Sequence, residues 1–412
     1  METILQHGNL IDGLSAEPLA DSLVIYEGDK ILYAGPYRRE EAERYPQAEV
    51  LDVTGKTVMP GLIDAHVHLT LYGKPSSVMD FLVDSATYTA LKAADCAKKL
   101  LEAGFTTVRT MGDKASADFA VKRAINEGMI PGPRLLTSGK GISITGGHGD
   151  FVPGDVQLDT IGETCDGVDQ VRRAVRDRLK NNADNIKLMA TGGGNSPGPG
   201  TVSQLSEEEM RVAVEEAANR GVLTAAHCIG ADGIKRAIRA GVRTIEHGSF
   251  LDDEGIEMML RGDHYLVPTL CAFRTLKYGP EGGVPDYVLE KIRLFATAHY
   301  KGLEKAYKAG VRIVCGTDTG TPFNYHGEGA EELEMYTKVG MTPMEAIKTA
   351  TSVAAECLRQ GDVGVLAAGK TADLLIVDGD PVVDIGVLQD KGKIKVIHGP
   401  AAAGRPSPPL RG

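Results

Sequence analysis

Two histidines stand one residue apart at the end of an apolar run, in the segment PGLIDAHVHL that spans residues 60–69. Side chains of a β-strand alternate between two faces. In a strand from Leu62 to His68, the imidazoles of His66 and His68 therefore share a face, about 7 Å apart along the backbone. Both rings can then reach one metal ion. An incidental pair, hydrogen-bonded to its neighbours, is the alternative that this segment leaves open.

Further residues that suit a metal site follow at the ends of later apolar segments. Lys187 lies in NIKLMATGGG, His227 in TAAHC, His247 in IEHGS and Asp318 in CGTDTG. Imidazole and carboxylate ligands suit zinc, with manganese, iron or cobalt as substitutes. Glu246 precedes His247, and the alternation of strand side chains predicts that it points away from the site.

Lys187 is surrounded in sequence by apolar residues. Burial disfavours the charged form of a lysine and lowers its pKa, which favours the neutral amine. A neutral amine can react with CO2 to give a carbamate, an anionic ligand with two oxygens that can bridge two metal ions. The alternatives are that Lys187 pairs with Asp318 or extends to the rim of the site.

Asp318 would lie at the mouth of an apolar strand. A carboxylate in such a place needs a partner, and a metal-bound water is the partner most useful for catalysis. Asp318 is therefore a candidate both for metal binding and for proton transfer.

Eight predicted strands would position these residues, and amphipathic helical patterns separate them. The strands are Leu62–His68, Thr106–Thr110, Arg134–Ser138, Asn185–Ala190, Leu223–His227, Thr244–His247, Tyr265–Leu270 and Arg312–Thr317. The clearest helices are Ala86–Ala103, Val168–Asn181, Ser206–Asn219, Ala231–Ala240 and Pro285–Ala309. This alternation predicts an α/β fold, a (β/α)8 TIM barrel whose active site lies at the C-terminal ends of the strands.

The two chain ends carry short β-type runs of their own. They occur at Thr3–Gln6, Ser22–Tyr26, Lys30–Ala34 and Val50–Val53, and again in GVLAAGKTADLLIVDGDP near the C-terminus. We therefore expect residues 1–57 and 360–400 to form a composite β-sandwich domain, with the barrel at 58–359. Residues 401–412, rich in Ala, Pro and Gly, are expected to be disordered.

Composition excludes several other classes of protein. Of 412 residues, 42% are hydrophobic and 25% charged, as in ordinary globular proteins. The net charge of -11 argues against a nucleic-acid partner. The six cysteines form no close pair, which fits reduced thiols in a cytoplasm. No long apolar stretch or leader pattern is seen, so neither secretion nor a membrane span is expected.

The ordered set of PGLIDAHVHL, the strand-end Lys187, AAHC, IEHG and GTDTG resembles the amidohydrolase superfamily, in its imidazolonepropionase-like and Xaa-Pro or Xaa-Arg dipeptidase-like branch. The resemblance covers nearly the whole chain, since GKTADLLIVDGDP is similar to the strand that closes the family's flanking sandwich. The HxH pair alone would not identify the family, but the ordered set is specific.

The resemblance implies a centre with two divalent metal ions, usually zinc. Six residues would hold them: His66, His68, Lys187, His227, His247 and Asp318. The first two histidines and the aspartate would bind the more buried ion, and the two later histidines the more exposed one. The lysine, carboxylated by CO2, would bridge both.

The resemblance also implies amide hydrolysis by a hydroxide that the two metals share and activate. Asp318 would orient this hydroxide and carry its proton to the departing nitrogen. His148, in ITGGHGD after the third strand, resembles the family histidine that contacts the substrate carbonyl or carboxylate; a loop histidine in water is the alternative. The substrate would be a small-molecule amide or dipeptide. Because members of this family are often oligomeric, the resemblance also predicts a homo-oligomer.

Substrate choice is expected to depend on the loops after the strands. The loop TGGGNSPGPGT at 191–201 is a predicted pocket wall, and it lacks the lysine of a phosphate-binding loop. After the fifth strand, the resemblance to prolidase-like members implies the sequence HAY, with a tyrosine that holds the substrate carboxylate. At the position of that tyrosine this chain has Ile229. An apolar residue there indicates a bulkier, less polar substrate.

Three functions remain open on the sequence. The first is hydrolysis of a peptide or N-acyl amino acid, which all five ligand motifs favour. The second is hydrolysis of a cyclic amide by an imidazolonepropionase-like enzyme. The third is a non-catalytic barrel that only binds ligands, which is disfavoured because no ligand position is missing.

Overall fold

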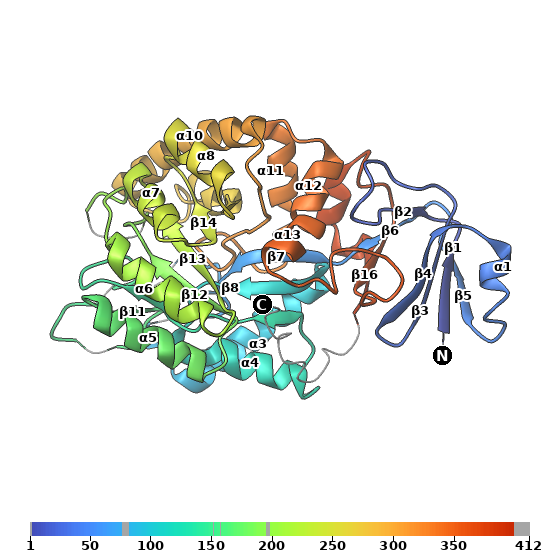
Figure 1. Ribbon diagram of the computed structural model, residues 1–412, viewed down its shortest axis with the longest axis horizontal. Coiled ribbons are helices and arrows are strands. Elements are labelled where there is room, and N and C mark those ends of the chain that lie inside the picture. Colours follow the sequence, from blue (N-terminus) through green and yellow to red (C-terminus); the bar gives the residue numbers. More distant parts are fainter. Residues whose placement is uncertain (1, 76–81, 151, 157, 195–197, 399–412) are drawn as a thin grey trace.

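The computed structural model describes residues 2–75, 82–150, 152–156, 158–194 and 198–398. Its largest part is a barrel of parallel strands surrounded by helices, and a smaller all-β part lies at one end of the molecule (Figure 1). This arrangement confirms the predicted fold, an α/β barrel with a small β-sandwich from both chain ends.

The barrel consists of two parallel sheets that a further segment joins. One sheet contains β7 (Leu62–Val67), β8 (Phe105–Thr110) and β9 (Arg134–Leu136). The other contains, in spatial order, β11 (Gly162–Thr164), β10 (Gly141–Ser143), β12 (Asn185–Met189), β13 (Leu223–Cys228), β14 (Thr244–His247) and β15 (Tyr265–Val267). The third predicted strand is thus divided, because β9 pairs with β8 whereas β10 pairs with β12.

The predicted eighth strand, Arg312–Thr317, is not a regular strand. Its segment makes isolated bridges, Ile313 with Leu266 and Thr319 with Val67, and so still closes the barrel between β15 and β7. The backbone comes so close to its neighbours that a Cβ on Gly316 would lie 2.3 Å from a methyl of Val267. A glycine is therefore needed at this position, and the segment still exchanges backbone hydrogen bonds with both neighbouring strands.

Twelve α-helices lie within the described residues, and they include all five predicted ones. Their bounds are α1 (Arg39–Ala42), α3 (Ala86–Glu102), α4 (Ala117–Asn126), α5 (Val168–Lys180), α6 (Glu207–Ala218), α7 (Ala231–Arg239), α8 (Asp253–Arg261), α9 (Arg274–Tyr278), α10 (Asp286–Ala309), α11 (Glu331–Val339), α12 (Pro343–Thr349) and α13 (Ser352–Cys357). Capping boxes fix the starts of α6, at Ser206 and Glu209, and of α12, at Thr342 and Glu345. None of the described helices has the length and apolar character that crossing a bilayer requires.

The small β part contains two four-stranded sheets. One has the order β4 (Lys30–Pro36), β3 (Ser22–Glu27), β1 (Glu2–Gln6), β5 (Glu49–Asp52). The other has the order β17 (Ile394–Ile397), β16 (Leu374–Val377), β6 (Thr57–Pro60), β2 (Asn9–Leu10), so it joins the two ends of the chain. The domain boundaries at 57/58 and 359/360 stay a prediction, and the tail at 401–412 lies outside the described residues.

Strand β16 connects the sandwich to the barrel through its two faces. Leu374 and Ile376 pack in the core between the small sheets, whereas Leu375 and Val377 pack in the main barrel core. This alternation follows from the two-residue period of a strand. Elsewhere in the core, all six cysteines are buried and none forms a disulfide.

Replacing Leu375, which is fully buried, by alanine should destabilise the folded protein by about 2–5 kcal/mol, because a cavity opens between the barrel and the sandwich. The change is measured as a lower midpoint of denaturant-induced unfolding. Val383→Ala is the matched control, since Val383 is 83% exposed. Equal midpoints for the two variants would contradict this account of β16.

Candidate metal centre

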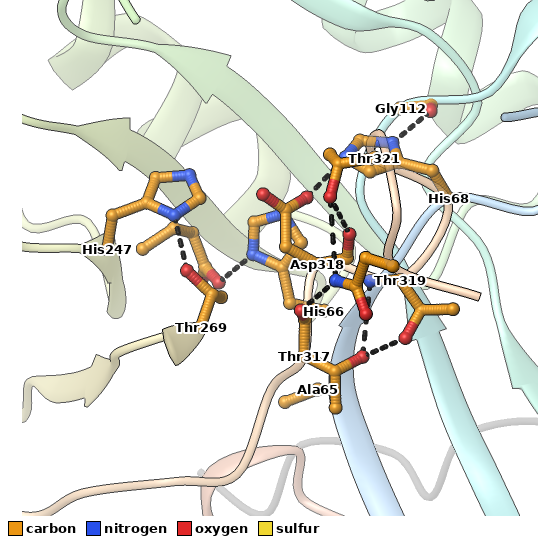
Figure 2. A network of polar contacts seen from close by, with 12 residues as sticks. Ala65, His66, His68, Gly112, His247, Thr269, Thr317, Asp318, Thr319 and Thr321 are labelled. Atoms are coloured by element: carbon orange, nitrogen blue, oxygen red, sulfur yellow. Dashed lines mark hydrogen bonds and ion pairs between the residues drawn. The ribbon is translucent and has the colours of Figure 1, made fainter. Parts of the chain in front are cut away.

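Three predicted ligands come together at the C-terminal end of the barrel. The ligand atoms of His66, His247 and Asp318 all lie within 4.8 Å of one another, and all three residues are buried. They come from β7, from the end of β14 and from the segment that closes the barrel, and Figure 2 shows their side chains directed toward one another. Segments far apart in sequence therefore form one buried group with the chemistry of a metal site.

The imidazoles of His66 and His68 are held through their Nδ1 atoms. His66 Nδ1 is 2.7 Å from Glu246 Oε2. His68 Nδ1 donates to the carbonyl oxygen of Gly112 at 2.8 Å, a contact that Figure 2 shows. The Nε2 atoms of the two rings then face Asp318 Oδ1, at 3.5 and 3.2 Å respectively. A fixed Nδ1–H leaves Nε2 as the atom that can bind a metal.

The tautomer of His247 follows from its contact with Thr269. The two groups are 2.6 Å apart, and the Thr269 hydroxyl itself donates to the carbonyl oxygen of Pro268. Because its only proton is used there, Thr269 Oγ1 accepts from His247 Nδ1–H, and Nε2 keeps its lone pair. Both residues have left-handed backbone, with φ of 66° at His247 and 59° at Thr269.

The prediction that Glu246 points away from the site is wrong. Its carboxylate is fully buried in the barrel interior, between His66 and the guanidinium of Arg109, whose Nη2 lies 3.0 Å from Oε1. Strand alternation fails here because β14 ends at His247, where the left-handed backbone turns that side chain toward the same site. The available signal was Arg109 in the apolar strand FTTVRT, since a buried arginine requires a carboxylate partner.

His227 and His148 form the other side of the site. His227 Nε2 donates to the carbonyl oxygen of Gly192 at 2.8 Å, so Nδ1 is its free ligand atom. Its ring stacks on His148, with centroids 4.1 Å apart, and lies edge-on to His247 at 4.5 Å. A Cβ on Gly193 would lie 2.5 Å from the His148 ring, so a glycine is needed there. Of the loop predicted at 191–201, residues 195–197 lie outside the described residues.

Lys187 is buried on β12, with 2% of its surface exposed, and no hydrogen bond or ion pair joins its amine to any described residue. Neither alternative for this side chain, pairing with Asp318 or extension to the rim, is therefore found. Burial lowers its pKa to about 8. At pH 7 about a tenth of such amines are neutral, against far fewer for an exposed lysine.

Burial also controls the charge of the imidazoles. It lowers the pKa of His66, His227 and His247 well below the usual value, with help from neighbouring positive groups. These rings are therefore neutral at pH 7, which is the form that binds metals. At Asp318 burial acts to raise the pKa, but the interactions with His66, His68 and Lys187, which include a hydrogen bond from His68, outweigh it, and the carboxylate is ionised.

Comparisons with known proteins agree with this fold. Residues 57–398 match the model of the Amidohydrolase family, so the chain belongs to that family. It is 34% identical to ochratoxinase of Aspergillus niger, over 94% of this chain and 83% of that protein. It is also similar to a crystal structure of a prolidase complexed with N-methylphosphonate-L-proline, with 35% identity, a TM-score of 0.88 and coverage of 97% and 98%. A Xaa-Pro dipeptidase with bound methionine has 33% identity, a TM-score of 0.86 and coverage of 96% and 100%.

The family and the buried ligand group define the class of protein. It is a metal-dependent hydrolase of the amidohydrolase family that acts on carbon–nitrogen or peptide bonds, with His66, His247 and Asp318 as a candidate metal site. The predicted family resemblance and enzyme class are thereby confirmed.

Glu246→Gln should weaken metal binding by about 10–100-fold, because the amide orients the His66 ring less strongly and leaves Arg109 without a charged partner. The measurement is zinc retained per chain against increasing chelator. Glu356→Gln is the control, because this carboxylate accepts from Tyr265 at the start of β15, at the end of the barrel opposite the ligand group. Unchanged zinc retention in Glu246→Gln would show that the buried network does not act on the metal site.

Proposed function

We propose that this protein hydrolyses the amide bond of an N-acyl amino acid or a dipeptide at a centre of two divalent metal ions, most simply zinc. The observation that carries the proposal is the buried group of His66, His247 and Asp318, with His68 and His227 beside it, next to the Lys187 amine, which has no hydrogen-bonding partner among the described residues. These donors fit two metal ions better than one, since six groups exceed the four ligands of an ordinary zinc site.

The contacts among these groups support a ligand assignment. His66, His68 and Asp318 would hold one ion, and His227 and His247 the other. Lys187, carboxylated by CO2, would bridge them, because its carbamate supplies two oxygens and cancels a buried positive charge. When bound, the two ions would supply an activated water and polarise the substrate carbonyl.

Asp318 would move the proton that amide cleavage requires. Its Oδ1 faces His66 and His68, and its depressed pKa keeps it ionised and ready to accept a proton from water. Transfer of that proton to the leaving nitrogen makes the departing group a neutral amine. The left-handed backbone at Asp318, with φ of 57°, fixes the direction of the side chain.

Two side chains, the neutral imidazole of His148 and the amine of Lys291, support a substrate that carries a carboxylate. Burial, together with the charges of Lys187, His68 and Lys291, lowers the pKa of His148 to about 3, so this ring is a neutral hydrogen-bonding group. Lys291, on α10, donates to the carbonyl oxygen of Gly198 in the neighbouring loop. The buried Ile229 favours an apolar rather than a polar leaving amino acid.

The test is a mass-spectrometric hydrolysis screen of the zinc-loaded protein against dipeptides and N-acyl amino acids. Amino acids should be released, those with apolar side chains fastest. Asp318→Asn should lower kcat by about 10²–10⁴-fold, because the proton carrier is lost. Asp253→Asn, which changes an exposed ion pair with Lys305, should keep parental kcat. No release from any member of the library by zinc-loaded protein would reject the peptidase proposal and favour cyclic amides.

Lys187→Ala should retain fewer than two zinc ions per chain and lose nearly all activity, because the bridging carbamate cannot form. Addition of bicarbonate to protein prepared without CO2 should restore activity in the parent chain only. Lys235→Ala, which alters a lysine paired with Asp252 and Glu254, should bind zinc as the parent does. Full zinc content in Lys187→Ala would argue against a bridging role.

A further inference from the structure

The turn after β15 carries the residue that orients His247. Thr269 has left-handed backbone, with φ of 59° and ψ of 47°, and its hydroxyl accepts from His247 Nδ1. A β-branched residue in this conformation is strained, and such strain of about 1–3 kcal/mol persists only where the surroundings enforce it. The turn therefore needs a fixed partner.

Glu332 is that partner. It lies on α11 and is fully buried, and its two carboxylate oxygens accept from the two backbone N–H groups that directly follow Thr269. Leu270 N is 2.8 Å from Oε1 and Cys271 N is 2.7 Å from Oε2. The two-pronged contact fixes the peptide planes immediately beside Thr269, and with them the direction of its hydroxyl.

Burying the carboxyl group of Glu332 costs free energy of desolvation. Burial raises the pKa of Glu332 to about 7 even though the backbone donors of Leu270 and Cys271 oppose the shift. An apolar side chain of similar size would avoid the cost of desolvation but would leave two buried N–H groups without acceptors. The carboxylate is therefore explained by the two backbone N–H groups of the turn that it accepts from, and not by packing in the core.

A second contact ties the same turn to the segment that carries Asp318. Arg274, which follows the turn, donates from Nε to Glu331 on α11 at 2.6 Å, and its Nη1 lies 3.4 Å from Asn324 Oδ1. Asn324 in turn donates to the carbonyl oxygen of Thr317. The start of α11 thus contacts the turn at Thr269, and through Arg274 and Asn324 it is linked to the segment that carries Asp318.

We propose that Glu332 is a positioning residue for the metal centre: it fixes the turn so that Thr269 holds His247 with Nε2 directed at the metal. The inference rests on the metal-binding role of His247 in the proposed function. It assigns to Glu332 no contact with metal or substrate, and its action passes through Thr269.

The experiment measures zinc binding by chelator competition on the zinc-loaded protein, for single and double variants. Glu332→Gln should weaken the binding of one zinc ion by about 10–100-fold, and Thr269→Val should do the same. The double variant should lose no more than the larger single effect, because both residues act through one imidazole. Thr269→Ser, which keeps the hydroxyl, should bind zinc with the affinity of the parent chain.

Glu334→Gln on the same helix is the matched control, since its carboxylate pairs with Lys338 away from the turn. Its zinc affinity should equal that of the parent. Parental affinity in Glu332→Gln, or a double variant that loses the sum of the single effects, would overturn the inference.

If Glu332→Gln does not fold, Tyr336→Phe takes its place, because it removes a hydroxyl that lies next to Glu332 and donates to the carbonyl oxygen of Val314, and it leaves the carboxylate. Its smaller loss of zinc affinity should vanish in the Thr269→Val background, and a loss that persists there contradicts the inference. Zinc binding is read without any substrate. A parent chain that binds zinc as described but cleaves no amide therefore rejects the proposed function and leaves this inference standing.

Discussion

Each imidazole of the site can offer one directed lone pair only because its other ring nitrogen is held by a fixed acceptor. A ring with both nitrogens free could rotate, take a proton or turn its N–H toward the metal. The acceptors are of three kinds, namely a carboxylate, a hydroxyl and backbone carbonyls, and come from Glu246, Thr269, Gly112 and Gly192. Much of the barrel interior is organised to hold these four groups in place.

The acceptor for His66 shows how far this organisation extends. Glu246 is a full negative charge inside the barrel, and it is stable there because Arg109 lies against it and also donates to the carbonyl oxygen of Ala65. The guanidinium thus connects β8, β14 and β7 beneath the ligands. An ion pair so deeply buried adds little to stability compared with apolar packing. Its effect is to fix the orientation of one ring.

The sequence predicts the parts of the site that follow strand periodicity. His66 and His68 share a face because two residues complete one period, and His227, near the end of β13, lies beside His247. It could not predict groups that enter by irregular backbone. His247 reaches the site from a left-handed residue, which reverses the expected orientation of Glu246.

Contacts between residues far apart in the sequence could not be predicted from local sequence patterns either. Glu332 lies in a helix whose acidic first turn looks like ordinary capping, and only the folded chain brings it to the turn at Thr269. The barrel strands themselves were found to within a few residues, except for the segment from Arg312, which makes only isolated bridges to its neighbours. Periodicity carries no information about such contacts.

The sheet that joins the chain ends has a consequence for synthesis on the ribosome. Strand β6 has β2 on one side from early in translation, but its other neighbour, β16, emerges more than 300 residues later. During that interval one edge of β6 stays open, with apolar residues such as Val58 and Met59 that the finished protein buries. In the nascent chain this sheet is therefore completed only when β16 has been synthesised, and the apolar edge of β6 is covered from then on.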